Sequence, residues 1–290
     1  MFRESDIKSR KEEHKFWSLC FSTTNDAIYS GKLFESSSSG ALKESWFHLT
    51  SHYLVKNKSN INGLSKRSLL IWKPVRPFVK NCHLYGFRIG YYDCYKEFYA
   101  ESKEVFAEWL KFLSCIGIMQ NIEEDFHFLK EIGKGNIGTI FLAEEINTHT
   151  KYTVKYIKSN KFDEYIINEI NILRTLNHPN AVKLYKVYES DAGIYIVLDN
   201  LSETNLFQKI VDVKNFSEKD CLVFAKKIME FLDYFNSLNI IHRDIKLENF
   251  AMSSNAGNTD FKLIDFSMAT FDIITIILDV DRLAILHLRY

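Results

Sequence analysis

The sequence predicts an α+β fold in two units: a small β-barrel closed by one helix, then a unit that begins with strands and continues with helices. Its 290 residues exceed the ~100–200 of a usual domain. Short apolar runs separated by turn residues fill positions 27–100, and apolar residues return at helical spacing after Ser102. New strand signals start near residue 126. Together these observations favour two successive β-rich units over a single domain.

Composition excludes several classes of protein. With 46% hydrophobic residues the chain can bury cores, so it is not a disordered protein. Lys and Arg (37) balance Asp and Glu (37), so no basic field points to a nucleic-acid partner. Five scattered cysteines without a Cys-x-x-Cys pair indicate a reducing compartment.

Targeting signals are also missing from the sequence. The charged N-terminus does not resemble a secretory signal. The most apolar stretch, 271–290, is interrupted by Asp272, Asp279, Asp281 and Arg282, which argues against a transmembrane span. We therefore expect a cytoplasmic protein.

Changes in residue composition and apolar patterning along the chain predict how it is divided into domains. A polar lead-in covers 1–25, the first unit covers 26–116, the second unit covers 126–270, and an atypical apolar tail covers 271–290. In the first unit, strand signals such as 27–29, 32–34, 46–49 and 53–55 alternate with turns. Val105, Phe106, Trp109, Leu110 and Leu113 then recur at helical spacing behind a serine that can cap the helix.

This arrangement resembles a pleckstrin homology (PH) domain, a curved seven-stranded sheet closed by a C-terminal helix that carries a buried tryptophan. The resemblance covers about 26–116 and makes Trp109 that tryptophan. An unrelated small barrel with a helical lid is the alternative.

Two partners are open for this unit. It could bind a phosphoinositide and so attach the protein peripherally to a membrane, or it could bind another protein. Family members that bind phosphoinositides carry a basic cluster on the first two strands. Lys32 and Lys43 are present, but Ser45 stands where an arginine is expected, and a serine cannot supply the charge-assisted contacts of a guanidinium.

A glycine-rich segment opens the second unit. It has the pattern G-x-G-x-x-G and consists of Ile132, Gly133, Lys134, Gly135, Asn136, Ile137, Gly138, Thr139 and Ile140. A dinucleotide fingerprint leads into a helix, whereas this segment leads into an apolar β-branched run. A second strand follows with Lys155 in its middle. Glycines that let backbone N–H groups approach closely, beside a strand lysine, suit phosphate binding.

The next features resemble the N-lobe of a protein kinase. Glu169 lies beside the apolar stripe of an amphipathic helix, and in the family this glutamate pairs with the strand lysine. The resemblance implies that Ile132 and Ile140 cover the adenine of ATP. It also makes Leu198 the gatekeeper before a hinge that contains Asp199 and Leu201.

The most specific string is His242-Arg243-Asp244, followed at the family's spacing by Asn249. It matches the kinase catalytic loop H-R-D-x-x-x-x-N. The resemblance implies that Asp244 is the catalytic base, with Lys246 in the pattern of the serine/threonine-specific branch. It further implies that Asn249 and Asp265 bind Mg²⁺. Asp265 opens an Asp-Phe-Ser that replaces the family's D-F-G.

After Thr270 the resemblance stops. The last proline is Pro179, so no A-P-E motif follows, and the sequence predicts a complete β-rich N-lobe with an incomplete helical C-lobe. We expect uncovered apolar faces on the helices between Ser217 and Leu238. The sequence predicts a serine/threonine protein kinase that uses ATP and Mg²⁺ on protein substrates. The alternative is a truncated, pseudokinase-like nucleotide-binding or adaptor module without transfer.

Overall fold

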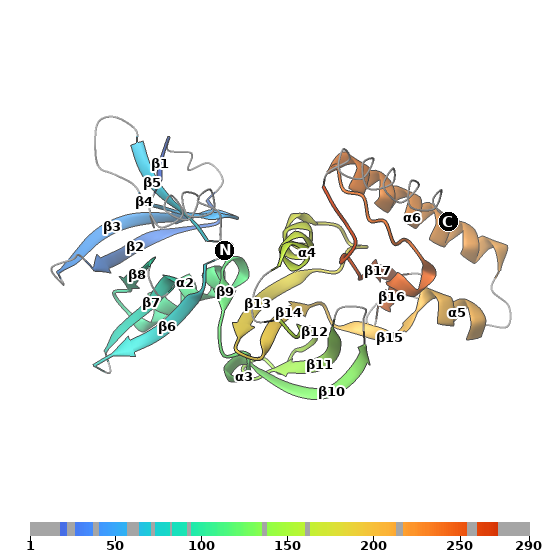
Figure 1. Cartoon of the computed structure of the whole chain (residues 1–290), viewed down its shortest axis with the longest axis horizontal. Helices are drawn as coiled ribbons and strands as arrows, with labels where there is room; N and C mark the ends of the chain where they lie inside the picture. The colour runs from blue at the N-terminus through green and yellow to red at the C-terminus, as the bar shows by residue number, and fades with distance from the viewer. Residues whose placement is uncertain are drawn as a thin grey trace, which may run out of the picture. The chain divides into compact units, whose positions relative to one another are not determined.

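The structure is a computed structural model. It describes residues 18–21, 27–36, 41–56, 64–70, 73–81, 83–91, 94–134, 138–159, 163–212, 217–253 and 260–271. Most of the expected lead-in, and the tail beyond Phe271, lie outside these residues. Contacts divide the chain into two units: the first ends at Glu124 and also takes in Lys186–Asp191, and the second contains the remainder. Figure 1 labels their elements.

The first unit is built on one sheet with the strand order β1-β5-β4-β3-β2-β8-β7-β6. Its strands are β1 (Ser18–Phe21), β2 (Tyr29–Ser36), β3 (Leu42–Leu49), β4 (Tyr53–Lys56), β5 (Leu64–Leu69), β6 (Val75–Lys80), β7 (Leu84–Tyr91) and β8 (Cys94–Tyr99). Neighbours pair antiparallel from β2 to β5 and from β6 to β8, and β2 also pairs with β8. Among the described strands, β1 and β6 stay at the two ends of this order, so the predicted closure into a barrel is not confirmed.

Alternation of apolar residues explains these strands and their shared core. Leu33, Phe47 and Phe98 have no exposed surface, and they come from positions that face one side of the sheet. The rings of Phe47 and Phe98 pack edge to face, with centroids 5.4 Å apart. The strand pattern predicted for this region is therefore present, with its apolar face buried.

Helix α2 (Lys103–Ile116) covers this core, as the sequence predicts. Ser102 caps the helix, because its Oγ accepts a hydrogen bond from the Val105 N–H at 3.2 Å. Trp109 is fully buried, and Tyr29 meets its ring edge-on at a centroid distance of 4.9 Å. After the helix, β9 (Ile118–Met119) pairs in parallel with β13 (Leu184–Ser190), and α3 (Ile122–Asp125) follows β9.

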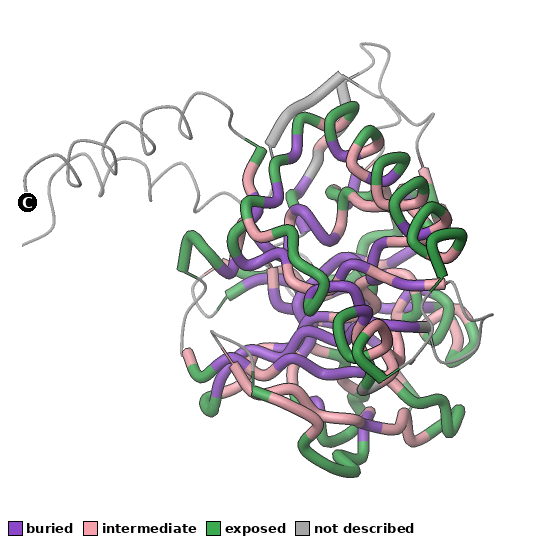
Figure 2. The backbone as a smooth tube through the Cα atoms, turned by 90° about the vertical axis from the view of Figure 1, so that its right-hand side faces the viewer, coloured by how far each residue is buried: buried purple, intermediate pink, exposed green. Residues whose placement is uncertain are grey.

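The second unit places strands first and helices later. Antiparallel strands β10 (Phe126–Lys134), β11 (Thr139–Glu145), β12 (Lys151–Ile157) and β14 (Gly193–Leu198) are hydrogen-bonded in that order. A smaller sheet has the order β15-β16-β17, with β15 (Leu201–Asn205), β16 (Phe250–Ser253) and β17 (Phe261–Leu263). The helices are α4 (Glu164–Thr175), α5 (Leu206–Asp212), α6 (Glu218–Ser237) and the 3₁₀ turn η1 (Leu247–Asn249). Figure 2 shows that the buried residues, in purple, are concentrated in the strands.

Local signals position the two long helices of this unit. Asp163 caps α4 by accepting a hydrogen bond from the Ile166 N–H at 3.0 Å, and Ile166, Ile170 and Leu173 are buried on one face. A reciprocal capping box between Ser217 and Asp220 starts α6.

Among the described residues, α6 leaves two large apolar side chains exposed, next to charged ones such as Lys226 and Glu230. Leu222 and Met229 are 64% and 66% exposed, which agrees with the predicted uncovered faces. No described helix is long and apolar enough to cross a bilayer.

Candidate active site

The central charged contact of the second unit joins a strand to a helix. The Nζ of Lys155 on β12 lies 2.6 Å from Oε1 of Glu169 on α4, and 3.9 Å from Oδ1 of Asp265. The Lys155 and Glu169 side chains are only 9% and 3% exposed. Burial raises the pKa of the Glu169 carboxyl, and the nearby ammonium opposes that shift. The structure thus brings these two predicted residues together as a buried ion pair.

A pocket of about 340 Å³ contains this lysine. The predicted residues that line it are Gly133, Lys134, Ile140, Lys155, Leu198, Leu201, Asn249 and Asp265. Among the described residues, Thr153, Asn205, Ile264 and Ser267 also line it. Aliphatic side chains supply apolar surface suited to a flat ring, and Lys155, Asn249 and Asp265 supply polar groups. This combination is typical of a small-molecule site.

The glycine-rich hairpin borders this pocket. A Cβ at Gly133 would meet no atom within 4 Å, so the pocket is open at this point. A Cβ at Gly138 would lie 2.2 Å from the Tyr156 carbonyl oxygen, so a close strand approach requires this glycine. Gly135, Asn136 and Ile137 lie outside the described residues. Ile132 on β10 and Thr139 on β11 flank the hairpin but do not line the pocket.

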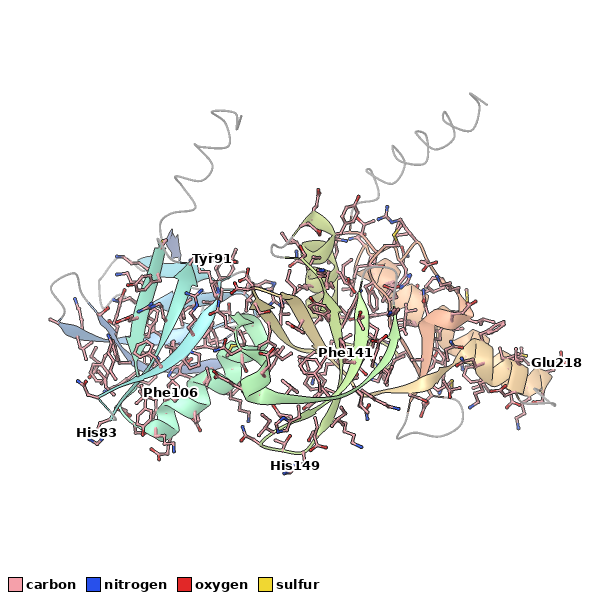
Figure 3. The ribbon with its side chains drawn as sticks, turned by 60° about the horizontal axis from the view of Figure 1, so that its bottom comes forward. His83, Tyr91, Phe106, Phe141, His149 and Glu218 are labelled. Atoms are coloured by element: carbon pink, nitrogen blue, oxygen red, sulfur yellow. The ribbon has the colours of Figure 1, made fainter. Side chains whose placement is uncertain are left out.

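A turn over residues 146–148 follows β11. His149, labelled in Figure 3, comes directly after this turn and has a positive φ of 56°. Lys155 therefore lies on β12, the second strand after the glycine-rich segment, as the sequence predicts.

The loop between α6 and η1 holds a carboxylate in a network of donors. Oδ2 of Asp244 accepts hydrogen bonds from Lys246 Nζ at 2.7 Å and from Asn249 Nδ2 at 3.0 Å. The hydrogen bond from Lys246 is the main cause that lowers the pKa of Asp244 below its ordinary value. Asp244 is therefore ionised at neutral pH and can accept a hydrogen bond.

Aromatic packing and backbone bonds hold this loop against the Asp265 segment. The His242 ring is buried and lies 5.3 Å from the Phe266 ring and 6.2 Å from the Phe235 ring. The backbones of Ile241 and Thr270 exchange two hydrogen bonds of 2.9 Å. Because of this packing, Asp244 and Asp265 belong to one rigid structure.

Serine replaces the expected glycine after Phe266. Ser267 is buried, and its N–H donates to Asp265 Oδ1 at 3.1 Å. The positive-φ residues of the described chain include Arg243 but not Ser267. The serine therefore adopts an ordinary backbone conformation here, and it orients the carboxylate of Asp265.

Asp199, predicted in the hinge, does not line the pocket. Its carboxylate accepts hydrogen bonds from Lys262 Nζ at 2.7 Å, the Lys183 N–H at 3.0 Å and the Tyr185 hydroxyl at 3.0 Å. This side chain therefore ties three segments together, and only its backbone remains for a role in binding.

Sequence reasoning missed four lining residues. Thr153 lies two residues before Lys155 on the same strand, so strand alternation could have placed it on the same face. Ile264 and Ser267 lie next to the predicted Asp265 and Phe266 and could have been included. Asn205, in contrast, reaches the pocket through the course of β15, which no local signal predicts.

Oxygen ligands for a divalent cation are present among the pocket residues. Asn249 Nδ2 donates to Asp244, so the amide oxygen is the ligand atom that Asn249 offers. Asp265 adds a carboxylate on the same pocket. Amide and carboxylate oxygens are the donors that Mg²⁺ prefers, so this pair fits the ion.

Comparison with known proteins agrees with this geometry. The sequence model of the protein kinase domain matches residues 126–272. The chain belongs to the protein kinase family. The chain is similar to myosin light chain kinase A of Dictyostelium discoideum, with 30% identity over 155 residues, 52% of each chain. It is also similar to calcium-dependent protein kinase 5 of Plasmodium falciparum (isolate 3D7), with 35% identity over 142 residues, 48% of this chain and 25% of the relative.

The kinase domain therefore covers about half of this chain, and the chain spans about half or less of the length of these relatives. The family match begins at residue 126 and so does not include residues 1–125.

Proposed function

We propose that the chain is a serine/threonine protein kinase, which transfers the γ-phosphoryl group of MgATP to hydroxyl groups of proteins. The observation that carries this proposal is the convergence of the Lys155–Glu169 pair, Asn249 and Asp265 on one pocket. Lys246 supports the serine/threonine branch, because it stands two residues after Asp244 and donates to its carboxylate.

Each side chain has a role in this proposal. Lys155 binds the phosphates of ATP, and Glu169 fixes its position. Asn249 and Asp265 would hold Mg²⁺, which neutralises charge on the phosphates when bound. Asp244 orients the substrate hydroxyl and accepts its proton, while the hydroxyl oxygen bonds to the γ-phosphorus and the bond to the ADP oxygen breaks. Ile140, Leu198 and Leu201 enclose the base.

The rival function is nucleotide binding without transfer, in a pseudokinase-like or adaptor module. Incubation of the full chain with radiolabelled MgATP and a mixture of basic and acidic protein substrates separates the two. Label transfer that disappears in Asp244→Asn supports the kinase. Thermal stabilisation by MgATP with no transfer to any substrate supports the rival.

We propose that residues 26–116 form a PH-like domain and that residues 126–270 form the kinase domain. We also propose that the protein is cytoplasmic. The runs of four and three antiparallel strands and the capping helix with buried Trp109 support the PH-like domain. Lys32 Nζ lies 3.1 Å from Glu44 Oε1, which reduces the positive charge on the strand where a phosphoinositide headgroup would bind.

That ion pair, together with Ser45, favours a protein partner over a lipid for this unit. Pelleting of the full chain with vesicles of phosphatidylcholine, with and without a phosphoinositide, tests this choice. Equal, weak binding to both vesicles is expected. Phosphoinositide-dependent pelleting that is lost in the double variant Lys32→Ala and Lys43→Ala would assign the lipid instead.

A further inference from the structure

Among the described residues that line the pocket, Thr153 carries a buried hydroxyl group. Thr153 lies on β12, opposite Leu198 of β14, and only 3% of its surface is exposed. The same lining contains the aliphatic residues Ile140, Leu198, Leu201 and Ile264. A polar group in such surroundings needs a hydrogen-bond partner.

The partner is the backbone of the segment after β14. The N–H of Leu201 donates to Thr153 Oγ1 at 3.2 Å, across 48 residues of sequence. A hydroxyl has one donor hydrogen and two acceptor lone pairs. The amide occupies one lone pair, and no other hydrogen bond of this hydroxyl is present among the described residues. The hydrogen and the second lone pair therefore remain for a bound molecule.

We propose that the Thr153 hydroxyl forms a hydrogen bond with the base of the nucleotide; this proposal rests on the proposed function. A backbone N–H can only donate, so by itself it would favour a base with a ring acceptor, such as adenine N1. A hydroxyl can donate or accept, so it also pairs with a ring donor, such as guanine N1–H. The amide of Leu201 holds the hydroxyl in place. The consequence is a pocket that accepts both adenine and guanine nucleoside triphosphates.

Calorimetric titration of the full chain with MgATP and with MgGTP tests this inference. In the wild type the Kd for GTP should exceed that for ATP by less than about tenfold. Thr153→Ser keeps the hydroxyl and should keep this ratio. Thr153→Val keeps the shape, removes the hydroxyl and frees the Leu201 N–H, so the ratio should rise about tenfold, through weaker GTP binding. Thr153→Ala gives the same readout if the valine variant does not fold.

Two results would overturn the inference while leaving the proposed function intact. One is a wild type that binds MgATP but discriminates against MgGTP by more than about a hundredfold. The other is an unchanged ratio in both Thr153→Val and Thr153→Ala. A wild type that binds neither nucleotide would overturn the proposed function as well. If Thr153 had only a structural role, its replacement would weaken the binding of both nucleotides equally, and the ratio of the two Kd values would stay unchanged.

Discussion

Replacement of Glu169 by glutamine should destabilise the second unit by about 3 kcal/mol. Removal of one partner from a buried ion pair costs roughly 3–5 kcal/mol, because the other charge stays buried without compensation. Here the carboxylate of Asp265, 3.9 Å from the Lys155 ammonium, remains as a weaker partner. We therefore expect the lower end of that range. Glutamine keeps the size of the side chain, so no cavity adds to the cost.

The distribution of tryptophan makes this effect measurable in the full chain. All four tryptophans, at 17, 46, 72 and 109, precede the second unit. Tryptophan fluorescence therefore follows unfolding of the first unit, while far-UV circular dichroism follows both. In urea, Glu169→Gln should lower the midpoint of the dichroism transition by about 1–2 M, at a slope of ~2 kcal/mol/M. The fluorescence transition should not move.

Glu164→Gln is the matched control, since it makes the same chemical change at an exposed position of the same helix. Its midpoint should stay close to that of the wild type. Equal midpoints for the two variants would refute the reasoning, because they would mean that the buried pair contributes no more than a surface carboxylate.

Three further predictions concern the catalytic loop and the first unit. Asp244→Asn should lower phosphoryl transfer by about 10²–10⁴-fold and leave the calorimetric Kd for MgATP within about threefold; a large loss of affinity would contradict the assigned role. Ser102→Ala should destabilise the first unit by about 1 kcal/mol in the fluorescence-detected urea transition, whereas Ser102→Asp, which can still cap α2, should not. Burial opposes ionisation of Glu97, but hydrogen bonds from Tyr99, Arg88 and Lys80 lower its pKa to about 2. The ionised Glu97 carboxylate should thus stabilise the first unit fully above about pH 4.5. As the pH falls toward 2 this stabilisation should be lost, so the fluorescence-detected Tm should fall in the wild type and less steeply in Glu97→Gln.

Much of the fold follows from local patterns in the sequence. Leu33 and Phe47 are buried because alternate residues of a strand face one side of a sheet, and that pattern is visible without coordinates. Helices α2 and α4 begin where Ser102 and Asp163 can accept a backbone hydrogen bond. The approach of Lys155 to Glu169 was expected only through the kinase resemblance, since no local pattern joins a strand to a particular helix.

The sequence by itself determined the elements, the glycine hairpin and the string from His242 to Asn249, because these depend on neighbours along the chain. Only the tertiary structure decided that the Asp199 carboxylate turns to Lys262 and Tyr185, and that Thr153 holds the Leu201 amide inside the pocket. These contacts join residues 14 to 63 positions apart. Their formation depends on which strands pair and in which register, and a buried polar group bonds to whatever partner that packing brings within reach.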